Sequence, residues 1–428
     1  MDKFTIQGPT PLRGTIPISG SKNAALPLMA AALLADGPTV ITHVPKLKDI
    51  YTFNNVLRVT GTHVQFDGLA NRLIIDPSHL AHIEAPYDLV RKMRASFYML
   101  GSLVGRTGQA RVSLPGGCAW GPRPVDLHLK GLEAMGVQLD LDGGYVVAKT
   151  GKTLPKTEFT LNPSSVGATI NLLLAAVLRS EQFTIRNAAK EPDVVQLCEA
   201  LLKMGADIEG AGTDTLTIRR VGKLKAVPLR NSPDRIETGT FMIAAAMHPE
   251  SDLLLTDTNP EDLGVFSETL SQTGAIIETA PDRIRVQAPE SIRPVSIETA
   301  IYPGFPTDLQ AQWSTMMTQA EGRSTVTDAI YMDRFSYVPE LKRLGANMSV
   351  YGNKVSIEGP NRLSGASVMS TDLRASVSLV LAGMVSRGET NVLRIYHLDR
   401  GYEDLEQKLN RVGASIQRSE DPPEPAAS

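Results

Sequence analysis

The chain has 428 residues, which is more than one hydrophobic core of about 250–300 residues usually serves, so two domains are expected. Its hydrophobic content of 42% and charged content of 21% are typical of a soluble globular protein, and a net charge of −3 gives no reason to expect nucleic acid or an anionic membrane as a partner. The longest apolar run, residues 26–35, is well short of the roughly 18 residues that a membrane span needs.

Cysteine and histidine usage limits the chemistry further. The two cysteines are far apart and predict neither a disulfide framework nor a metal-ligand spacing, and the seven histidines are scattered. The first residues show no signal-peptide pattern. We therefore expect a cytoplasmic protein with no metal ion, no other cofactor and no obligate protein partner.

From the N-terminus onward, one pattern recurs six times: an apolar helix that ends in glycine, a short strand, a turn and a second strand. The spacing of about 70 residues is too long for a solenoid repeat and fits a compact α/β subdomain. Each glycine suits the left-handed position just after a helix, and the turn residues that follow predict β-hairpins. The six glycines are Gly61, Gly136, Gly205, Gly274, Gly345 and Gly413.

The sixth repeat lacks its second strand, because the end of the chain becomes acidic and proline-rich. Residues 3–9 match residues 354–360 of the fifth repeat in character, so we expect the first strand of the chain to complete the last repeat. The chain would then form one domain from residues 21–232, a second from residues 1–20 and 233–419, and a disordered tail from residues 420–428. Two crossings between the domains would make a hinge over a cleft.

Each repeat also contains a helix that opens with small residues. Helix N-termini bind anions through free N–H groups and the helix dipole, so these openings could form an anion site in the cleft. Three of the six carry Lys or Arg where the dipole disfavours cations, and a bound anion would offset that cost. Asp308 and Ser165 would also serve as ordinary N-caps. The openings begin at Lys22, Arg94, Ser165, Glu237, Asp308 and Arg374.

Residues 114–124 hold three glycines and three prolines around Cys118, a composition that predicts an ordered but movable loop. Arg123 nearby favours the thiolate, so Cys118 is a candidate acid or nucleophile. Cys198, in contrast, has Leu201 and Leu202 at helical spacing and is expected in the core. No glycine-rich stretch matches a Walker loop or a dinucleotide fingerprint, which disfavours ATP hydrolysis and NAD chemistry.

Together these segments resemble the enolpyruvyl transferases, and in particular the branch that uses UDP-N-acetylglucosamine as acceptor. The resemblance covers nearly the whole chain. It implies an α/β fold, an inside-out α/β barrel of two domains, each with three βαβαββ repeats, joined by a double-crossover hinge. The segments that carry it are residues 21–27, 45–49, 93–96, 114–128, 233–240, 305–308, 371–376 and 396–401.

The resemblance also implies an activity. The enolpyruvyl group of phosphoenolpyruvate would pass to the 3′-hydroxyl of UDP-N-acetylglucosamine by addition and elimination through a tetrahedral intermediate, with release of phosphate. This reaction is the first committed step of peptidoglycan synthesis, and it uses two small-molecule substrates.

Site residues follow from the same resemblance. Cys118, Asp308 and Lys22 would be catalytic: Cys118 as the acid that protonates the enol carbon, Asp308 in deprotonation of the sugar hydroxyl. Phosphoenolpyruvate would be held by Lys22, Asn23, Arg123, Arg334, Arg374 and Arg400. The UDP-sugar pocket would be lined by Asn23, Arg94, Arg123, Pro124, Val125, Asp126, Leu127, Pro163, Ser164, Ser165, Val166, Asp308 and Ile330. At position 163, many members of the family have lysine.

Two other interpretations are open. A transferase that acts on shikimate 3-phosphate shares the fold and the chemistry but lacks the cysteine loop. A non-catalytic paralogue that binds a UDP-sugar and regulates the pathway would be expected to have lost Cys118, Asp308 or Lys22, and this chain has all three.

Overall fold

The computed structural model describes residues 2–91, 93–115 and 125–420. Contacts divide the chain into two compact units, which are described one at a time. The continuous unit is Gly20–Ser232, and the discontinuous unit is Met1–Ser19 with Pro233–Ser428. The chain therefore passes from one unit to the other twice, after Ser19 and after Ser232.

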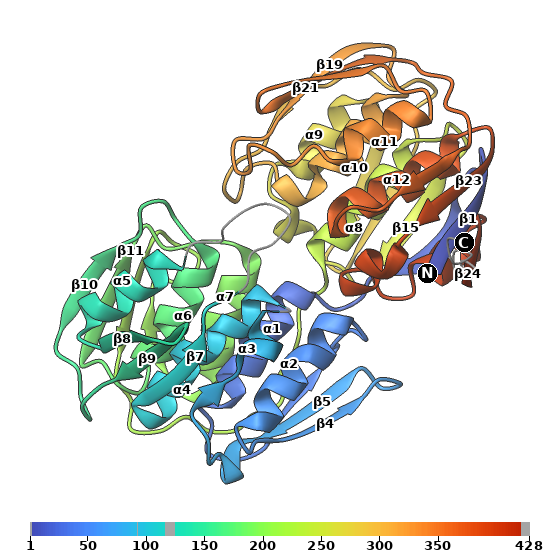
Figure 1. Ribbon diagram of the computed structural model, residues 1–428. Coiled ribbons are helices and arrows are strands. Elements are labelled where there is room, and N and C mark those ends of the chain that lie inside the picture. Colours follow the sequence, from blue (N-terminus) through green and yellow to red (C-terminus); the bar gives the residue numbers. More distant parts are fainter. Residues whose placement is uncertain (1, 92, 116–124, 421–428) are drawn as a thin grey trace, which may run out of the picture. The chain divides into compact units, whose positions relative to one another are not determined.

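The continuous unit contains three repeats of the order βαβαββ (Figure 1). The first comprises β14 (Leu229–Arg230), α1 (Lys22–Ala32), β3 (Thr39–Thr42), α2 (Lys48–Val59), β4 (His63–Asp67) and β5 (Arg72–Asp76), followed by η1 (Pro77–His79). The second comprises β6 (Glu84–Ala85), α3 (Tyr87–Val90), η2 (Arg94–Phe97), α4 (Tyr98–Thr107), β7 (Gln109–Ser113), α5 (Asp126–Met135), β8 (Gln138–Asp142) and β9 (Tyr145–Lys149). The third comprises β10 (Thr157–Thr160), α6 (Val166–Ala176), β11 (Gln182–Arg186), α7 (Pro192–Met204), β12 (Asp207–Glu209) and β13 (Thr215–Arg219).

The discontinuous unit contains three more repeats of the same order. The first comprises β2 (Arg13–Pro17), α8 (Arg235–Ala246), β15 (Asp252–Thr256), η3 (Pro260–Leu263), α9 (Phe266–Gln272), β16 (Ile276–Ala280) and β17 (Arg283–Gln287). The second comprises β18 (Ile297–Glu298), η4 (Thr307–Leu309), α10 (Gln310–Met317), β19 (Gly322–Thr327), α11 (Tyr337–Arg343), β20 (Met348–Tyr351) and β21 (Lys354–Gly359). The third comprises β22 (Ser367–Met369), α12 (Leu373–Val385), β23 (Gly388–Leu393), η5 (Ile395–Arg400), α13 (Leu405–Arg411), β24 (Ser415–Glu420) and β1 (Asp2–Gly8).

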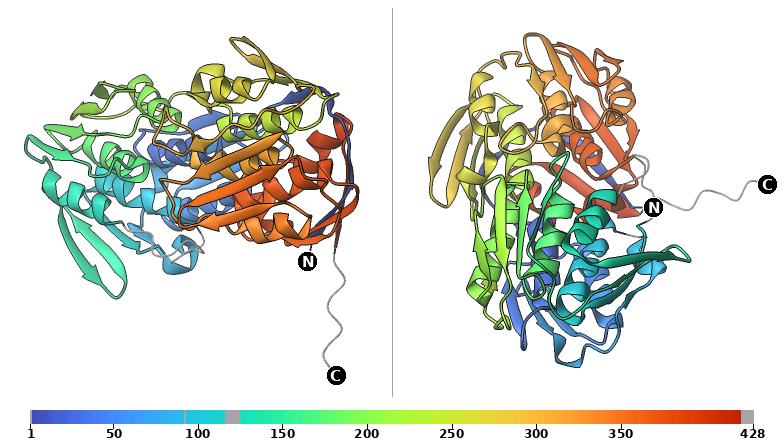
Figure 2. Two further views of the ribbon diagram at one scale, coloured as in Figure 1. Left: turned by 90° about the horizontal axis from the view of Figure 1, so that it is seen from above. Right: turned by 90° about the vertical axis from the view of Figure 1, so that its left-hand side faces the viewer.

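Every repeat folds into its own four-stranded sheet, and the described residues form six of these sheets. In each sheet one outer pair of strands is parallel and the other pairings are antiparallel, as in the order β10-β11-β13-β12. In five sheets the outer antiparallel pair is a hairpin, and in the sixth it is formed by β24 and β1, which lie at opposite ends of the chain. The expected α/β class is thus confirmed. In both units the sheets lie towards the outside and the helices towards the inside (Figures 1 and 2).

The six repeat glycines all adopt the left-handed conformation expected of them, with φ between +89° at Gly61 and +111° at Gly413. A residue with a Cβ would be strained there, whereas glycine is not. Each glycine follows the end of one helix and turns the chain into the next strand, so the spacing of these glycines in the sequence equals the length of one structural repeat.

One helix of each repeat is buried on nearly all sides. In α6, for example, every residue from Ala168 to Ala176 is buried, and in α8 every residue from Ile236 to Ala246 is buried. Helices that are apolar all round belong inside a core. Small residues let them approach closely: a Cβ on Gly101 of α4 would lie 2.3 Å from the carbonyl oxygen of Asn171 of α6. These inner helices are α1, α4, α6, α8, α10 and α12.

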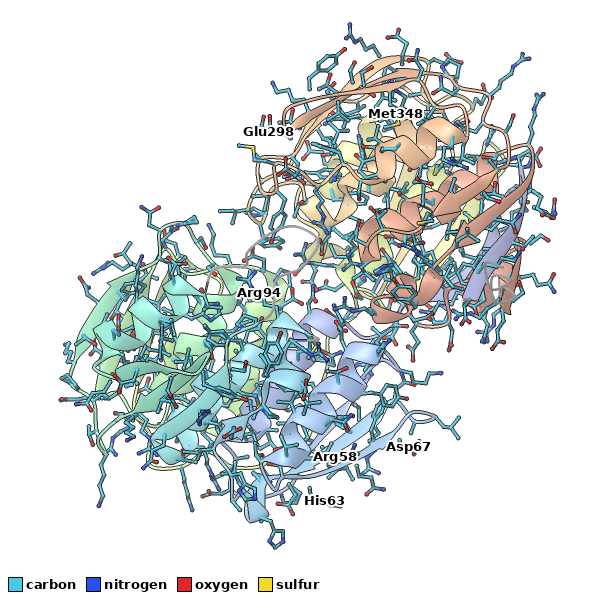
Figure 3. All side chains as sticks on the ribbon, viewed as in Figure 1. Arg58, His63, Asp67, Arg94, Glu298 and Met348 are labelled. Atoms are coloured by element: carbon cyan, nitrogen blue, oxygen red, sulfur yellow. The ribbon has the colours of Figure 1, made fainter. Side chains whose placement is uncertain are left out.

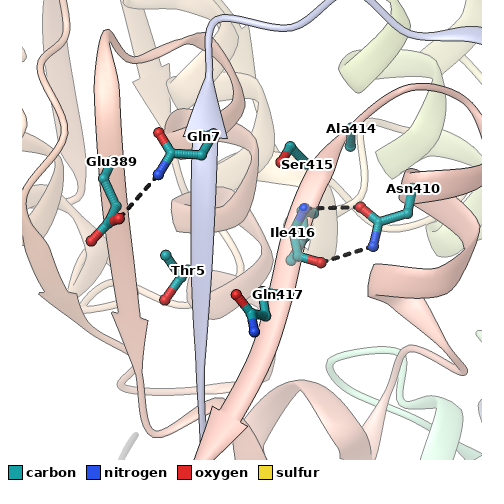
Figure 4. A pocket seen from close by; sticks show the side chains of 8 residues that line it. All are labelled: Thr5, Gln7, Glu389, Asn410, Ala414, Ser415, Ile416 and Gln417. Atoms are coloured by element: carbon teal, nitrogen blue, oxygen red, sulfur yellow. Dashed lines mark hydrogen bonds between the residues drawn. The ribbon is translucent and has the colours of Figure 1, made fainter.

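The sixth sheet is completed by the first strand of the chain. β1 lies between β23 and β24, antiparallel to both, and Asp2 is opposite Glu420. Glu420, expected in the tail, instead belongs to a strand, because its backbone pairs with β1 in spite of the acidic composition; residues 421–428 lie outside the described part. At the edge, the Asn410 amide donates to the carbonyl of Ile416 and accepts from its N–H, at 2.8 and 2.9 Å (Figure 4).

Within the described residues, no helix has both the length and the apolar character that crossing a membrane requires.

Candidate functional site

In the discontinuous unit, Asp308 lies between two arginine side chains, one from its own repeat and one from the next repeat. Asp308 is part of η4, at the start of α10; Arg334 follows β19, and Arg374 is in the first turn of α12. Arg334 Nη2 lies 2.8 Å from Asp308 Oδ1, and Arg374 Nη2 lies 3.3 Å from Asp308 Oδ2. The structure thus brings together three of the residues to which the sequence assigns substrate contacts.

Asp308, Arg334 and Arg374 form a cluster of opposite charges that shifts the pKa of the carboxylate. Burial alone would raise the pKa of Asp308, but Arg374 and Arg334 hold it well below its usual range. The Arg374 side chain is only 4% exposed, against 28% for Asp308, and its guanidinium lies 5.4 Å from the centre of the Tyr402 ring. Arg374 Nε and Nη1 are buried without a hydrogen-bond partner among the described residues. A buried donor without an acceptor is costly, and an anion would supply the missing acceptor.

Aspartate caps open two inner helices of this unit. Asp234 accepts from the N–H groups of Ile236 and Glu237 at the start of α8, at 2.8 and 3.0 Å. Asp372 accepts from Arg374 N at 2.9 Å at the start of α12. Arg235 and Arg374 lie in the first turns of these helices, at the end where the dipole disfavours a cation, and the charge of Arg374 is compensated by Asp308 and Asp234. Arg400, the remaining assigned arginine, ends η5.

In the continuous unit, serine takes the place of aspartate as the cap. Ser21 Oγ accepts from Ala24 N at 3.2 Å at the start of α1 and donates to Asp193 at 3.1 Å. Lys22, the first residue of α1, is paired with Asp49 of α2 at 3.0 Å. Asn23, beside it, is exposed.

Residues assigned to the UDP-sugar pocket gather around a buried histidine that the sequence interpretation did not single out. His128 of α5 stacks edge-on against Phe97 of η2. The first residue of η2 is Arg94, which is labelled in Figure 3. A Cβ on Gly167 of α6 would lie 3.1 Å from the His128 ring. His128 therefore links three segments: the one that begins with Arg94, the start of α5 with Asp126 and Leu127, and the start of α6 with Ser165 and Val166. Val125 directly precedes α5, and Ser164 directly precedes the α6 cap.

The protonation of His128 is fixed by its partners. Asn171 Oδ1 accepts from Gly101 N at 2.6 Å, so the Asn171 amide nitrogen lies 2.8 Å from His128 Nδ1 and donates to it. Nδ1 must then be unprotonated. Burial, and after it the charge of Arg94, lowers the pKa of His128 to about 3, although Asp126 opposes the shift. The histidine is a neutral structural group at physiological pH.

Other assigned residues are placed as follows. Pro163 is exposed, in the turn before α6, and Ile330 is exposed, in the loop after β19. Cys118, Arg123 and Pro124 lie outside the described residues. Cys198 is buried in α7, as expected for a core residue, and burial raises the pKa of its thiol to about 12.

Several residues that support the site were not found from the sequence: Asp49, Asp193, His128 with Asn171, and the pair Thr307 and Asp328. Asp49, His128 and Thr307 do lie within segments that carry the family resemblance, so a signal for them was present. The partners that they contact are distant in sequence, and only the folded chain shows the pairing.

In the part of the chain that the structure describes, His, Cys, Asp and Glu side chains nowhere gather in a group that would hold a metal ion. A basic hollow of about 360 Å³ lies where α1, α4 and α6 end, with Arg106, Arg179, Arg220 and Lys223 among its lining. Arg179 donates to the carbonyls of Gly105 and Arg106 at 2.9 and 2.8 Å, so it neutralises the end of α4.

Comparison with known proteins now defines the class. The profile of the family described as EPSP synthase (3-phosphoshikimate 1-carboxyvinyltransferase) matches residues 6–409. The enolpyruvyl transferase NikO from Streptomyces tendae has a similar structure, with a TM-score of 0.89 and 28% identity over 98% of this chain and 99% of that one. An EPSP synthase from Acinetobacter baumannii, with a TM-score of 0.78 and 18% identity over 98% and 100% of the two chains, shares the fold. The chain belongs to this family of enolpyruvyl transferases, as its motifs predict.

Within the family, the chain is similar over nearly its whole length to one group of curated relatives. The UDP-N-acetylglucosamine 1-carboxyvinyltransferase of Chloroherpeton thalassium is 50% identical over 420 residues, which are 98% of this chain and 97% of the relative. The protein with the same name from Xanthobacter autotrophicus is 48% identical over 427 residues, 98% and 99% of the two chains.

Proposed function

We propose that the chain transfers the enolpyruvyl group of phosphoenolpyruvate to the 3′-hydroxyl of UDP-N-acetylglucosamine and releases phosphate, in peptidoglycan synthesis. The observation that carries this proposal is Arg374, a buried guanidinium beside Asp308 with two donors that no described residue satisfies. Phosphoenolpyruvate offers a carboxylate and a phosphate, which are the acceptors that guanidinium groups bind most strongly. The names of the relatives supply the acceptor sugar.

In this proposal the cations bind and the carboxylate acts as base. Lys22, Asn23, Arg123, Arg334, Arg374 and Arg400 hold phosphoenolpyruvate. Asp308 accepts the proton of the sugar hydroxyl. In the free protein its low pKa makes Asp308 a weak base, because both arginines neutralise it. When phosphoenolpyruvate shares the charge of those arginines, the basicity of Asp308 rises as the reaction begins.

The covalent steps balance as an addition followed by an elimination. The sugar oxygen bonds to C2 of phosphoenolpyruvate while Cys118 delivers a proton to C3, which gives a tetrahedral intermediate. In the elimination, the Cys118 thiolate takes a proton back from C3 and phosphate leaves C2 with the proton that Asp308 had accepted, which restores the double bond in the product and both side chains. Because both substrates are multiply charged metabolites, we infer that the reaction takes place in the cytoplasm.

The nucleotide sugar would be bound mainly through the group around His128. Arg94, the segment from Arg123 to Leu127, the residues from Pro163 to Val166, and Ile330 are the proposed contacts. The neutral His128, held through Nδ1 by Asn171, would keep the helix starts of α5 and α6 in register without adding charge.

Phosphate release tests the proposal. Wild-type protein is given phosphoenolpyruvate with UDP-N-acetylglucosamine, with shikimate 3-phosphate, or with no acceptor; release is expected only with the nucleotide sugar. The variant Arg374→Gln, which keeps hydrogen-bonding capacity but loses the charge, should raise KM for phosphoenolpyruvate by about tenfold or more, as expected for a charged hydrogen bond. Release with shikimate 3-phosphate, or with no acceptor, would contradict the proposal.

A further inference from the structure

Asp328 is a buried carboxylate to which neither the sequence nor the proposed mechanism gives a role. It directly follows β19 and is 0% exposed. Four neutral donors surround it: the hydroxyls of Thr299 and Thr307, both at 2.7 Å, and the N–H groups of Ile330 and Tyr331, both at 2.9 Å. Within the described residues, no Lys or Arg forms an ion pair with it. Burial of a carboxylate costs free energy, and hydrogen bonds to both of its oxygens offset that cost.

The two oxygens of Asp328 hold different segments. Oδ1 accepts from Thr299 and from the N–H groups of Ile330 and Tyr331, so it shapes the turn that carries Ile330. Oδ2 accepts from Thr307, the residue next to Asp308. A turn of the chain needs only the first set of bonds. The bond to Thr307 is therefore the feature that a purely local role leaves unexplained.

Thr307 connects Asp328 to the arginine of the candidate site. The Thr307 hydroxyl accepts from Arg334 Nη1 at 3.0 Å, so its single proton is directed to Asp328. Arg334 Nη2, on the same guanidinium, lies 2.8 Å from Asp308. A chain of contacts thus runs from Asp328 through Thr307 and Arg334 to Asp308.

The backbone of Asp328 is held independently of its side chain. Asp328 N donates to the carbonyl of Asn353 at 2.9 Å, and the Asn353 amide donates back to the carbonyl of Asp328 at 3.2 Å. Arg334 is tied to α10 by Gln310, whose amide donates to the Arg334 carbonyl at 2.7 Å. A side-chain substitution at position 328 can therefore change the contacts of the carboxylate while the strand end stays anchored.

We propose that Asp328 is a positioning residue whose two oxygens act on two different steps. Oδ2, through Thr307, aims Arg334 at Asp308 and supports turnover; Oδ1 fixes the Ile330 turn and supports binding of the nucleotide sugar. This inference rests on the proposed function, because it assigns Asp328 to the same reaction.

The decisive comparison is between two substitutions of Thr307. Thr307→Val keeps the shape of the side chain and removes the hydroxyl, whereas Thr307→Ser keeps the hydroxyl and removes a methyl group. If Thr307 orients Arg334, the Val variant loses kcat by about tenfold or more, since small misplacements of catalytic groups have large effects. The Ser variant stays close to wild type. If Thr307 only fills space, the Ser variant is the worse of the two, and the proposal is overturned.

Asp328→Asn tests the carboxylate itself. The amide retains one oxygen for the Ile330 and Tyr331 N–H groups, but its NH₂ cannot accept from Thr307. The expected result is the same loss of kcat as in Thr307→Val, with an unchanged KM for UDP-N-acetylglucosamine. The double variant should be no worse than either single one, because both remove one link. Additive losses would contradict the proposed chain.

Thr299→Val addresses the other oxygen. It removes the donor to Oδ1 and the acceptor of Ala329 N, a contact of 3.0 Å, so KM for UDP-N-acetylglucosamine should rise several-fold with little change in kcat. An unchanged KM would remove the binding half of the proposal.

Thr273→Val is the matched control, since the hydroxyl of this buried threonine also donates a hydrogen bond, in this case to the carbonyl of Leu270 at 2.7 Å, but forms no hydrogen bond with a described residue of the site. It should leave kcat and KM unchanged when rates are normalised to the native fraction. Absence of wild-type turnover would overturn the proposed function and this inference together. Wild-type turnover with equal behaviour of Thr307→Val and Thr307→Ser would overturn only the role of Asp328.

Discussion

The two units fold by the same repeat but open their inner helices differently. In the discontinuous unit, α8 and α12 are capped by Asp234 and Asp372, and arginines follow in the first turn. In the continuous unit, α1 and α6 are capped by Ser21 and Ser165. A carboxylate cap adds a negative charge at the helix N-terminus, which helps a nearby cation to be buried there. A hydroxyl cap adds no charge, so a cation at that end needs an acidic partner from another element, as Lys22 has in Asp49. The shared repeat thus determines where the helix N-termini lie, and the cap residue determines the charge at each of them.

Of the substitutions in the two units, Asp308→Asn in the discontinuous unit should have the largest effect on turnover. Loss of a general base typically costs about 10²- to 10⁴-fold in rate, so kcat should fall by that amount. Binding of phosphoenolpyruvate should be retained or strengthened, since the carboxylate no longer competes for Arg334 and Arg374. Steady-state phosphate release and calorimetric titration with phosphoenolpyruvate measure the two quantities.

Lys22→Gln is the counterpart in the continuous unit and should mainly raise KM for phosphoenolpyruvate. If Asp308→Asn weakened phosphoenolpyruvate binding as strongly as Lys22→Gln, the division into a basic role and a binding role would be wrong.

Acid should affect the two units in different pH ranges. His128 has a folded-state pKa of about 3 against an ordinary value of 6.5, so the folded chain binds its proton less readily than the unfolded chain does. The stability that the neutral histidine confers is complete above pH 6.5 and is lost as pH falls towards 3, with about 2 kcal/mol lost at pH 5. In the discontinuous unit, the contribution of Asp308 is kept until pH falls below the ordinary value of 3.8. His248 of that unit also has its pKa lowered by burial, but it is only partly buried, so its effect near pH 5 should be smaller than that of His128.

Hydrogen exchange followed by mass spectrometry at pH 7.5 and 5, corrected for the intrinsic rates, tests this difference. Amides of the continuous unit should lose protection first, and His128→Gln should remove most of the pH dependence, whereas His63→Gln, at an exposed position of β4, should not. Equal loss of protection in both units at pH 5 would contradict the prediction.

The smallest effect is expected at Pro163, which is exposed before α6. Pro163→Lys adds a positive charge at the proposed UDP-sugar pocket, and we expect it to act on the pyrophosphate group of that ligand. Because exposed ion pairs contribute about 1 kcal/mol or less, KM for UDP-N-acetylglucosamine should fall by no more than about fivefold, and the gain should vanish at high salt. A KM that does not respond at low ionic strength would place the pyrophosphate away from this turn.

Much of the fold was predictable because its signals are local. The period of Gly61 to Gly413 follows from the left-handed backbone that each position requires, and the hairpins follow from the turn residues after them. The similarity between residues 3–9 and 354–360 likewise placed β1 beside β24. The supporting contacts of the site were not predictable in this way. Asp49 reaches Lys22 across 27 positions and Asp328 reaches Thr307 across 21, and no pattern in the sequence reports such pairs.

The strands beside the two crossings have a consequence for how the chain can be divided. β2 pairs with β15 and β14 pairs with β3, so each unit keeps all twelve strands of its three sheets among its own residues in the described part of the chain. Asp234 N donates to the carbonyl of Ser19 at 2.9 Å, which places the two ends of the discontinuous unit side by side. The continuous unit is therefore an insertion into a closed loop of its host. A chain in which Ser19 is joined to Pro233 by a short linker would retain every sheet of the host, and residues 20–232 would retain every sheet of the insert.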